Sequence, residues 1–149
     1  MKAATTKTLY TFDYTIERGK IREFAQAIGD PNPIYHDIER AKEEGFKDIP
    51  IPPTFPTVME MWGGLDFDGL IRLLQLDPLR VLHGEQSYEY LQDVCANETL
   101  HATLHLKQTI DKPTMKIFVL ETTYKNEQGE TVLIGTSTVL ERKGGDKRD

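Results

Sequence analysis

Two side chains that can exchange a proton near neutral pH, Asp30 and His36, lie close together in a segment that prolines make rigid. The segment runs from Gly29 to Asp37 and reads Gly-Asp-Pro-Asn-Pro-Ile-Tyr-His-Asp. A carboxylate and an imidazole can act together as general acid and base, since an unperturbed histidine titrates near pH ~6.5. Asp30 and His36 are therefore the candidate catalytic residues.

Each of these residues also has a structural interpretation. An aspartate before proline commonly hydrogen-bonds its own backbone in a turn, and His36 could face solvent or cap the following helix. Neighbouring side chains of an extended backbone point to opposite faces, so Tyr35 rather than His36 could point into a site. Tyr35 could donate a hydrogen bond, but a phenol with a pKa of about 10 is a poor base at neutral pH. Asn32 is expected to brace the loop through its amide.

A predicted helix leads into this segment. Apolar residues recur at the i, i+3, i+4 and i+7 spacing of one helical stripe, and they are Ile21, Phe24, Ala25 and Ile28. Gly29 suits the left-handed position just past a helix end. Residues 9–16 are rich in aromatic and β-branched types and predict a strand before this helix. Asp37 is expected to cap a short helix over residues 38–44, closed by Gly45.

A proline-rich arm follows, with Pro50, Pro52 and Pro53. Thr54 or Thr57 is expected to cap the next helix, which ends at the glycine pair 63–64. An apolar flank predicts that this helix is buried, and it consists of Phe55, Val58, Met59 and Trp62. Residues 67–76 predict one more helix.

The second half of the chain predicts strands over residues 81–94, 99–107, 115–124 and 131–140. A strand, then helices, then at least four strands with hairpin-length links indicate the α+β class with a mostly antiparallel sheet. The length of 149 residues fits one domain, 1–149, with an ordered core over about residues 8–142 and a tail over 143–149.

Composition excludes some classes of function. The net charge of −6 argues against a nucleic-acid partner, which requires a basic face. No apolar run reaches the ~20 residues that cross a bilayer, and the first residues lack the apolar core of a signal peptide, so a cytoplasmic location is expected. Cys95, the single cysteine, agrees with a reducing compartment and has no evident activating base. His101 and His105 lie about 13 Å apart on a strand, too far to share a metal ion, and no metal site is predicted.

The segment 29–37, together with Ala41, Gly45 and residues 51–55, resembles the MaoC-like hydratases and dehydratases. The stretches 82–90 and 98–100 are similar to the N-terminal-half (FAS1-type dehydratase-like) branch of that family, and the similarity covers about residues 8–142. The resemblance implies a hot-dog fold, in which a curved antiparallel sheet wraps around a central helix, here residues 54–63. It also implies action on β-hydroxyacyl or enoyl thioesters of coenzyme A or acyl carrier protein, no metal or redox cofactor, and assembly in pairs of hot-dog units.

One position departs from the family pattern. Active members carry histidine five residues after the aspartate, where this chain has Tyr35, with His36 one position later. Two hypotheses follow from the resemblance. The chain could be a (3R)-hydroxyacyl-thioester dehydratase or enoyl-thioester hydratase subunit that is active as a homodimer through Asp30 and His36. Alternatively, it is a non-catalytic hot-dog subunit that binds acyl thioesters and requires a catalytic partner chain. A third hypothesis, which the resemblance favours less, is a protein with this fold that has no role with thioesters.

The reaction also requires a donor to the thioester oxygen. Backbone N–H groups at a buried helix N-terminus can supply one, so Thr54 or Phe55, next to Pro53, is the expected donor and binding segment. His83 resembles a recurrent family position near the pocket, although it could equally be a strand-end histidine bonded to backbone. An acyl tunnel could be lined by Phe55, Met59, Trp62 and leucines 70, 73 and 74, for which an ordinary core role is the alternative.

Overall fold

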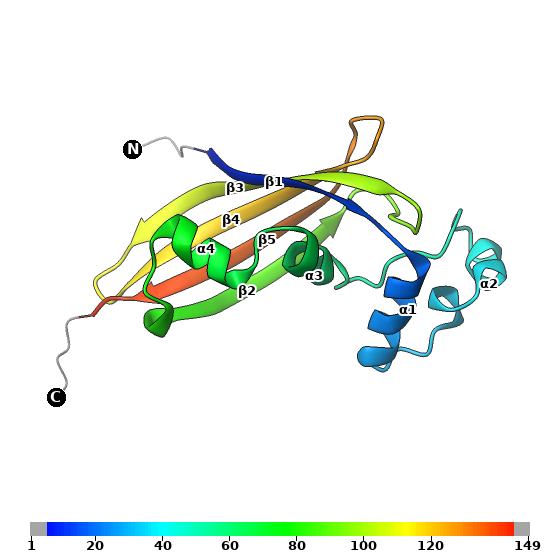
Figure 1. The fold of residues 1–149 in the computed structure, drawn as a ribbon, viewed down its shortest axis with the longest axis horizontal. Coiled ribbons are helices and arrows are strands. Elements are labelled where there is room, and N and C mark those ends of the chain that lie inside the picture. Colours follow the sequence, from blue (N-terminus) through cyan, green and yellow to red (C-terminus); the bar gives the residue numbers. More distant parts are fainter. Residues whose placement is uncertain (1–5, 145–149) are drawn as a thin grey trace.

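Five antiparallel strands form one curved sheet in the computed structural model, which describes residues 6–144. The strands are β1 (Lys7–Thr15), β2 (Val81–Tyr90), β3 (Thr99–Asp111), β4 (Met115–Lys125) and β5 (Thr131–Arg142). Their order across the sheet is β1-β3-β4-β5-β2, which leaves β1 and β2 at the two edges (Figure 1). Hairpin connections account for the β3–β4 and β4–β5 neighbours, as the sequence predicts.

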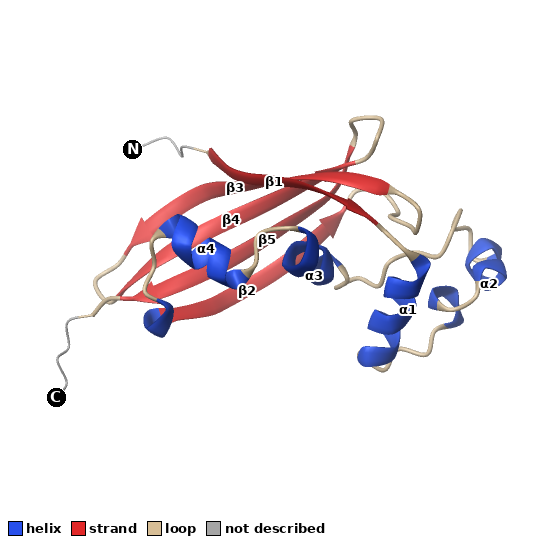
Figure 2. Cartoon of the chain, in the orientation of Figure 1, coloured by secondary structure: helices blue, strands red, loops and turns tan. Residues whose placement is uncertain are grey.

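The helices are short and fall into two groups (Figure 2). Beyond one end of the sheet lie α1 (Arg18–Ala27), the 3-10 turn η1 (Pro33–Tyr35) and α2 (Ile38–Glu43). Across one face of the sheet lie α3 (Pro56–Val58), its continuation η2 (Met59–Gly63) and α4 (Phe67–Leu74), before a second 3-10 turn, η3 (Pro78–Arg80). A single helix over residues 56–63, here called the central helix, therefore rests on the sheet in the place that a hot-dog fold requires.

The start of the central helix differs from the prediction. Phe55 occupies the N-cap position and makes no side-chain cap hydrogen bond, so the expected capping by Thr54 or Thr57 is wrong. The Thr57 hydroxyl lies 2.9 Å from the Tyr88 hydroxyl on β2 instead. Thr57 therefore ties the central helix to the sheet edge.

The second half of the central helix is a π-turn, and this changes which side chains are buried. Phe55 and Met59 are fully buried, as predicted, but Trp62 is 82% exposed. In a π-turn the backbone bonds reach i+5 rather than i+4, so the α-helical spacing no longer brings Trp62 onto the stripe of Phe55 and Met59. The predicted core position of Trp62 is therefore wrong in the isolated chain, whereas its place in an acyl tunnel stays a prediction.

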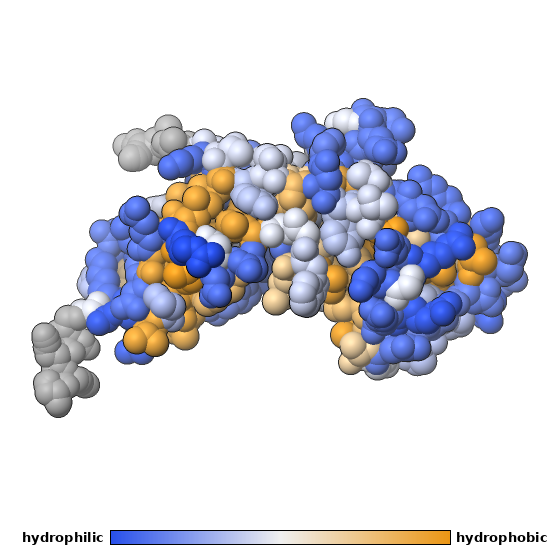
Figure 3. All heavy atoms as spheres, in the orientation of Figure 1, coloured by the Kyte–Doolittle hydropathy of each residue, from blue (hydrophilic) through white to orange (hydrophobic). Residues whose placement is uncertain are grey.

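The core has two parts. The larger part surrounds Phe55 and Met59 and includes Tyr35 and Tyr124, whereas the smaller part lies under α4 around Ile71 and Leu120. Hydrophobic side chains also gather on the surface over α4 (Figure 3). The sheet face that carries the helices is thus incompletely covered by this chain.

The remaining boundaries follow the predictions within a few residues. Strand β2 ends at Tyr90 rather than residue 94, because the chain leaves the sheet and forms a bridge between Pro50 and Cys95. Strand β3 continues to Asp111, past a bulge next to Leu106. No helix within residues 6–144 is long and apolar enough to cross a membrane. The predicted tail lies mostly outside the described residues.

Candidate functional site

The corner after α1 has the backbone that the glycine and prolines dictate. Gly29 adopts a φ of +73°, and the Asp30 N–H donates to the carbonyl of Ala25 at 2.8 Å, which closes the helix end. The Asp30 carboxylate then accepts the N–H of Asn32 at 3.0 Å, and the Asn32 side chain accepts the N–H of Ile34 at 3.2 Å. Both side chains therefore stabilise the turn, as the structural interpretation of the sequence expects.

The two candidate catalytic residues are adjacent, but their reactive groups are not paired. His36 Nε2 lies 3.4 Å from the backbone carbonyl oxygen of Asp30, not from its carboxylate. Among the hydrogen bonds of residues 6–144, none joins the Asp30 carboxylate to the His36 ring. The two groups are not placed for joint acid–base catalysis in this conformation. One of the two side chains would have to rotate to bring the carboxylate to the ring.

Tyr35, in contrast, points into the protein. Its side chain is buried, and this burial raises the pKa of its phenol. The negative charge of the nearby Asp30 raises the pKa further, to a smaller extent. Together with Pro53 and Tyr90, Tyr35 lines a pocket of about 240 Å³ between the corner and the proline-rich arm. Asp30, Asn32 and His36 do not contribute to this lining. Of the predicted site residues, the structure thus places Tyr35 and Pro53 in one pocket.

The proline-rich arm is held by strand β2 and by the loop that follows β2. The Tyr90 hydroxyl donates to the Pro53 carbonyl at 2.9 Å, and the Ile51 N–H donates to Val94 at 3.0 Å. The Phe55 N–H donates to the Pro52 carbonyl at 2.9 Å and is occupied within the arm. Thr54, whose N–H has no partner among the hydrogen bonds of the described residues, remains the predicted donor to a thioester oxygen.

His83 lies elsewhere. It is exposed near the start of β2, with Nε2 3.3 Å from Gln86 Oε1 and 3.4 Å from the Ser137 hydroxyl. Seven residues of strand separate it from Tyr90, or roughly 23 Å. Within one chain, His83 is therefore far from the pocket of Tyr35 and Pro53.

The other residues considered from the sequence lie outside this pocket. His101 is exposed and pairs with Asp13 on β1, and Cys95 is fully buried, which raises the pKa of its thiol to about 11. Within residues 6–144 no group of three or more histidine, cysteine, aspartate or glutamate side chains could hold a metal ion.

A half-buried acid on the central helix, Glu60, was not predicted from the sequence. Tyr124 donates its hydroxyl to Glu60 Oε2 at 2.9 Å, and Tyr88 donates to Oε1 at 3.2 Å. Burial raises the pKa of the Glu60 carboxyl, and the two hydrogen bonds oppose that rise. The available signal was a single charged residue inside the apolar run Val58 to Trp62.

An antiparallel sheet curved around a central helix defines the hot-dog fold, and here a proline-rich arm and a pocket lie at the start of that helix. Solved structures show the same fold. The C-terminally truncated HadBC (3R-hydroxyacyl-ACP dehydratase) complex from Mycobacterium tuberculosis superposes with a TM-score of 0.77 at 20% identity, covering 90% of this chain and 96% of that one. The (R)-hydratase from A. caviae, involved in PHA biosynthesis, gives a TM-score of 0.67 at 18% identity, covering 93% and 96%.

Sequence comparison narrows the class. The family model described as the FAS1-like dehydratase domain region matches residues 3–134. A UPF0336 protein of Thermobifida fusca is 34% identical over 129 residues, which cover 87% of this chain and 84% of that protein. A UPF0336 protein of Streptomyces coelicolor is 34% identical over 134 residues, which cover 89% and 87%. The chain belongs to the FAS1-like dehydratase domain family.

Proposed function

We propose that this chain is a subunit of a (3R)-hydroxyacyl-thioester dehydratase or enoyl-thioester hydratase, and that a second hot-dog chain supplies its catalytic acid–base pair. The observation that carries the proposal is the geometry of the corner. The His36 ring contacts the Asp30 backbone, the Asp30 carboxylate is occupied by Asn32, and Tyr35 holds the buried position. The corner therefore has the family's shape without its paired acid and base.

In this role the chain binds and positions the acyl thioester. Tyr35 and Pro53 line the pocket at the arm, and the Thr54 N–H lies at the start of the central helix, where the positive end of the helix favours a thioester oxygen that gains negative charge. Water addition or removal itself requires a base for water or the α-proton and an acid at the other end. The partner chain provides these groups, and neither metal nor redox cofactor takes part.

Two findings support a paired assembly. The HadBC structure is described as a complex, as is the ChsH1–ChsH2 structure from the same organism, which superposes with a TM-score of 0.71. The apolar Trp62 and Met61 on the central helix of this chain are 82% and 58% exposed, which is costly unless another chain covers them.

The second candidate is an autonomous homodimeric hydratase that uses Asp30 and His36. The 3.4 Å approach of the His36 ring to the Asp30 backbone favours it, because a rotation of the aspartate side chain could bring its carboxylate to the ring. The two candidates differ in whether the chain works alone.

An assay of crotonyl-coenzyme A hydration distinguishes the two candidate functions. The loss of enoyl absorbance measures the reaction. The full chain is assayed alone and after co-expression with a second hot-dog chain that carries histidine in the Tyr35 position. We expect no turnover alone, turnover in the complex, and little effect of Asp30→Asn in this chain. Turnover by the chain alone that Asp30→Asn abolishes, by the order of 10²–10⁴ that general acid–base help contributes, would establish the autonomous enzyme instead.

A further inference from the structure

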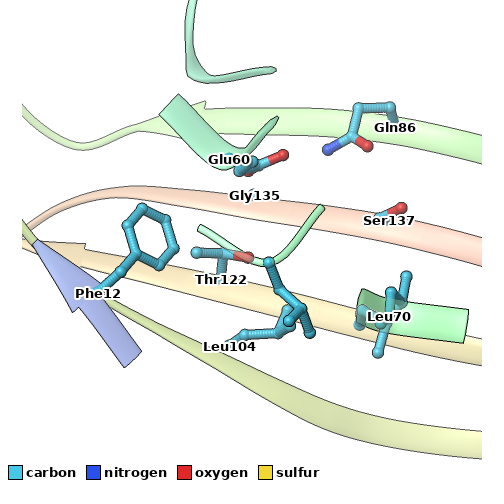
Figure 4. A pocket seen from close by; sticks show the side chains of 10 residues that line it. Phe12, Glu60, Leu70, Gln86, Leu104, Thr122, Gly135 and Ser137 are labelled. Carbon is cyan, nitrogen blue, oxygen red and sulfur yellow. The ribbon is translucent and has the colours of Figure 1, made fainter. Parts of the chain in front are cut away.

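A small cavity lies between the central helix, α4 and the sheet, at the junction of the two parts of the core. Its volume is about 90 Å³, below the ~150 Å³ of an engineered protein cavity that holds benzene. Its apolar wall consists of Phe12, Leu65, Leu70, Leu104 and Leu120, and its polar wall of Glu60, Gln86, Thr122 and Ser137. Figure 4 shows Phe12, Leu104 and Leu70 around the polar ends of Glu60 and Thr122. The cavity is therefore amphipathic.

The residues around Glu60 leave space for its side chain and donate hydrogen bonds to it. Gly135 on β5 leaves room for it, because a Cβ there would lie 2.9 Å from the Tyr88 ring and 3.3 Å from Glu60 Oε2. Tyr124 and Tyr88 each donate one hydrogen bond to the carboxyl group. A carboxylate offers about four acceptor positions, so about two remain for a ligand.

Glu60 has no cationic partner among the described residues. Glu60 is half-buried, and an acid that is partly removed from water without a cation is stabilised by hydrogen bonds or by taking up a proton. Glu60 also sits in a π-turn, an irregularity that is frequent at functional sites. These features indicate a site for a ligand group rather than a structural ion pair.

We propose that this cavity selects acyl groups that carry a hydroxyl near the end of the chain farthest from the thioester. This hydroxyl hydrogen-bonds to Glu60. This inference rests on the proposed function and names the substrate class of that site. A hydroxyl both donates and accepts, so it fits the carboxyl group whether ionised or protonated. A plain alkyl chain leaves Glu60 desolvated without a new partner, and a terminal carboxylate places a second acid beside it.

A thioester held at Thr54, as proposed above, would lie within one acyl-chain length of the cavity. Thr54, the predicted donor to the thioester oxygen, precedes Glu60 by six residues, or roughly 9 Å along a helix axis. Tyr90 holds the arm at Pro53, and Tyr88, two residues earlier on the same face of β2, holds Glu60. An acyl chain of several carbons that starts at the arm could therefore reach the cavity.

The test compares binding of octanoyl-coenzyme A, the hydroxyoctanoyl-coenzyme A isomers with the hydroxyl on the last three carbons, and the matching terminal dicarboxylic thioester. Titration calorimetry measures each dissociation constant for the full chain, alone and with its partner. We expect the preferred hydroxyacyl isomer to bind about tenfold to a hundredfold more tightly than octanoyl-coenzyme A. Glu60→Leu is expected to abolish or reverse this preference, and Glu60→Gln to retain part of it. Glu43→Leu, on an exposed helix face, is the matched control and is expected to keep the full preference.

The outcomes separate the two proposals. Loss or reversal of the preference in a Glu60→Leu variant that still binds thioesters supports the site, since a variant that merely misfolds binds no thioester. An equal preference in wild type and Glu60→Leu, or tight binding of octanoyl-coenzyme A with no preference, overturns the site while the proposed function stands. Failure of every thioester to bind, alone and with the partner, overturns both.

Discussion

Tyr124→Phe isolates one hydrogen bond in the Glu60 cluster. Tyr124 is fully buried, and phenylalanine keeps its ring, so the substitution removes the hydroxyl without emptying the core. That hydroxyl donates to Glu60 Oε2 at 2.9 Å. Loss of one partner of a buried polar group costs roughly 1–3 kcal/mol, so we expect a loss of about 2 kcal/mol in the free energy of unfolding. For a chain of this length that lowers Tm by about 4–8 °C.

Urea and thermal unfolding at pH 7 measure the loss, with Tyr10→Phe as the control. Tyr10 is on the edge strand β1 and 38% exposed, so the same chemical change there is expected to stay within about 0.5 kcal/mol. The same substitution is then made in a Glu60→Leu background. With the acceptor removed, Tyr124→Phe is expected to cost much less, which gives the coupling energy of the pair.

Two results would refute this reasoning. One is a Tyr124→Phe variant as stable as Tyr10→Phe, which would mean that the hydrogen bond contributes nothing. The other is an equal cost in both backgrounds, which would mean that the hydroxyl acts through a group other than Glu60.

Three further predictions concern the same elements. Burial raises the folded-state pKa of the Glu60 carboxyl above its ordinary 4.5, so ionisation of this group lowers the free energy of unfolding. As pH rises through that folded-state pKa, we expect the wild type to lose stability relative to Glu60→Gln. Urea midpoints of the two proteins that run parallel across pH would contradict this. Gly135→Ala brings a methyl against the Tyr88 ring and is expected to cost about 1–3 kcal/mol in urea unfolding, whereas Gly19→Ala, with open space around it, serves as control. Tyr35→His places histidine five residues after Asp30 and is expected to give the chain alone measurable crotonyl-coenzyme A hydration; Asp30→Asn in that background should remove it, and activity that survives would assign the base elsewhere.

Local sequence signals predicted the corner well. The left-handed Gly29 and the Asp37 cap, which accepts the Glu39 N–H at 2.9 Å, depend on residues within one or two turns of each other. The apolar stripe of α1 is confirmed for Ile21, Phe24 and Ala25, but Ile28 follows the helix as its C-cap and is 50% exposed. The class of fold followed from the order of the elements and from the family resemblance. The roles of Asp30 and His36 in catalysis stay predictions.

The Glu60 cluster could not be predicted in the same way. Tyr124 is 64 residues away from Glu60 in the sequence, and their contact forms only when β4 passes beneath the central helix. The exposure of Trp62 depends on the π-turn, and the spacing of apolar residues in the sequence does not predict a π-turn. Non-local packing and one irregular turn thus decide the features that periodicity missed.

The π-turn makes the central helix sensitive to chain length as well as to side-chain identity. Deleting one residue within 59–63 would allow ordinary α-helical bonding and would rotate everything after the deletion by about 100° around the helix axis. The tryptophan would then swing toward the sheet, and α4 would dock with a different side. Insertions and deletions at this point, more than substitutions, could therefore reshape the interior of such a protein in a single step.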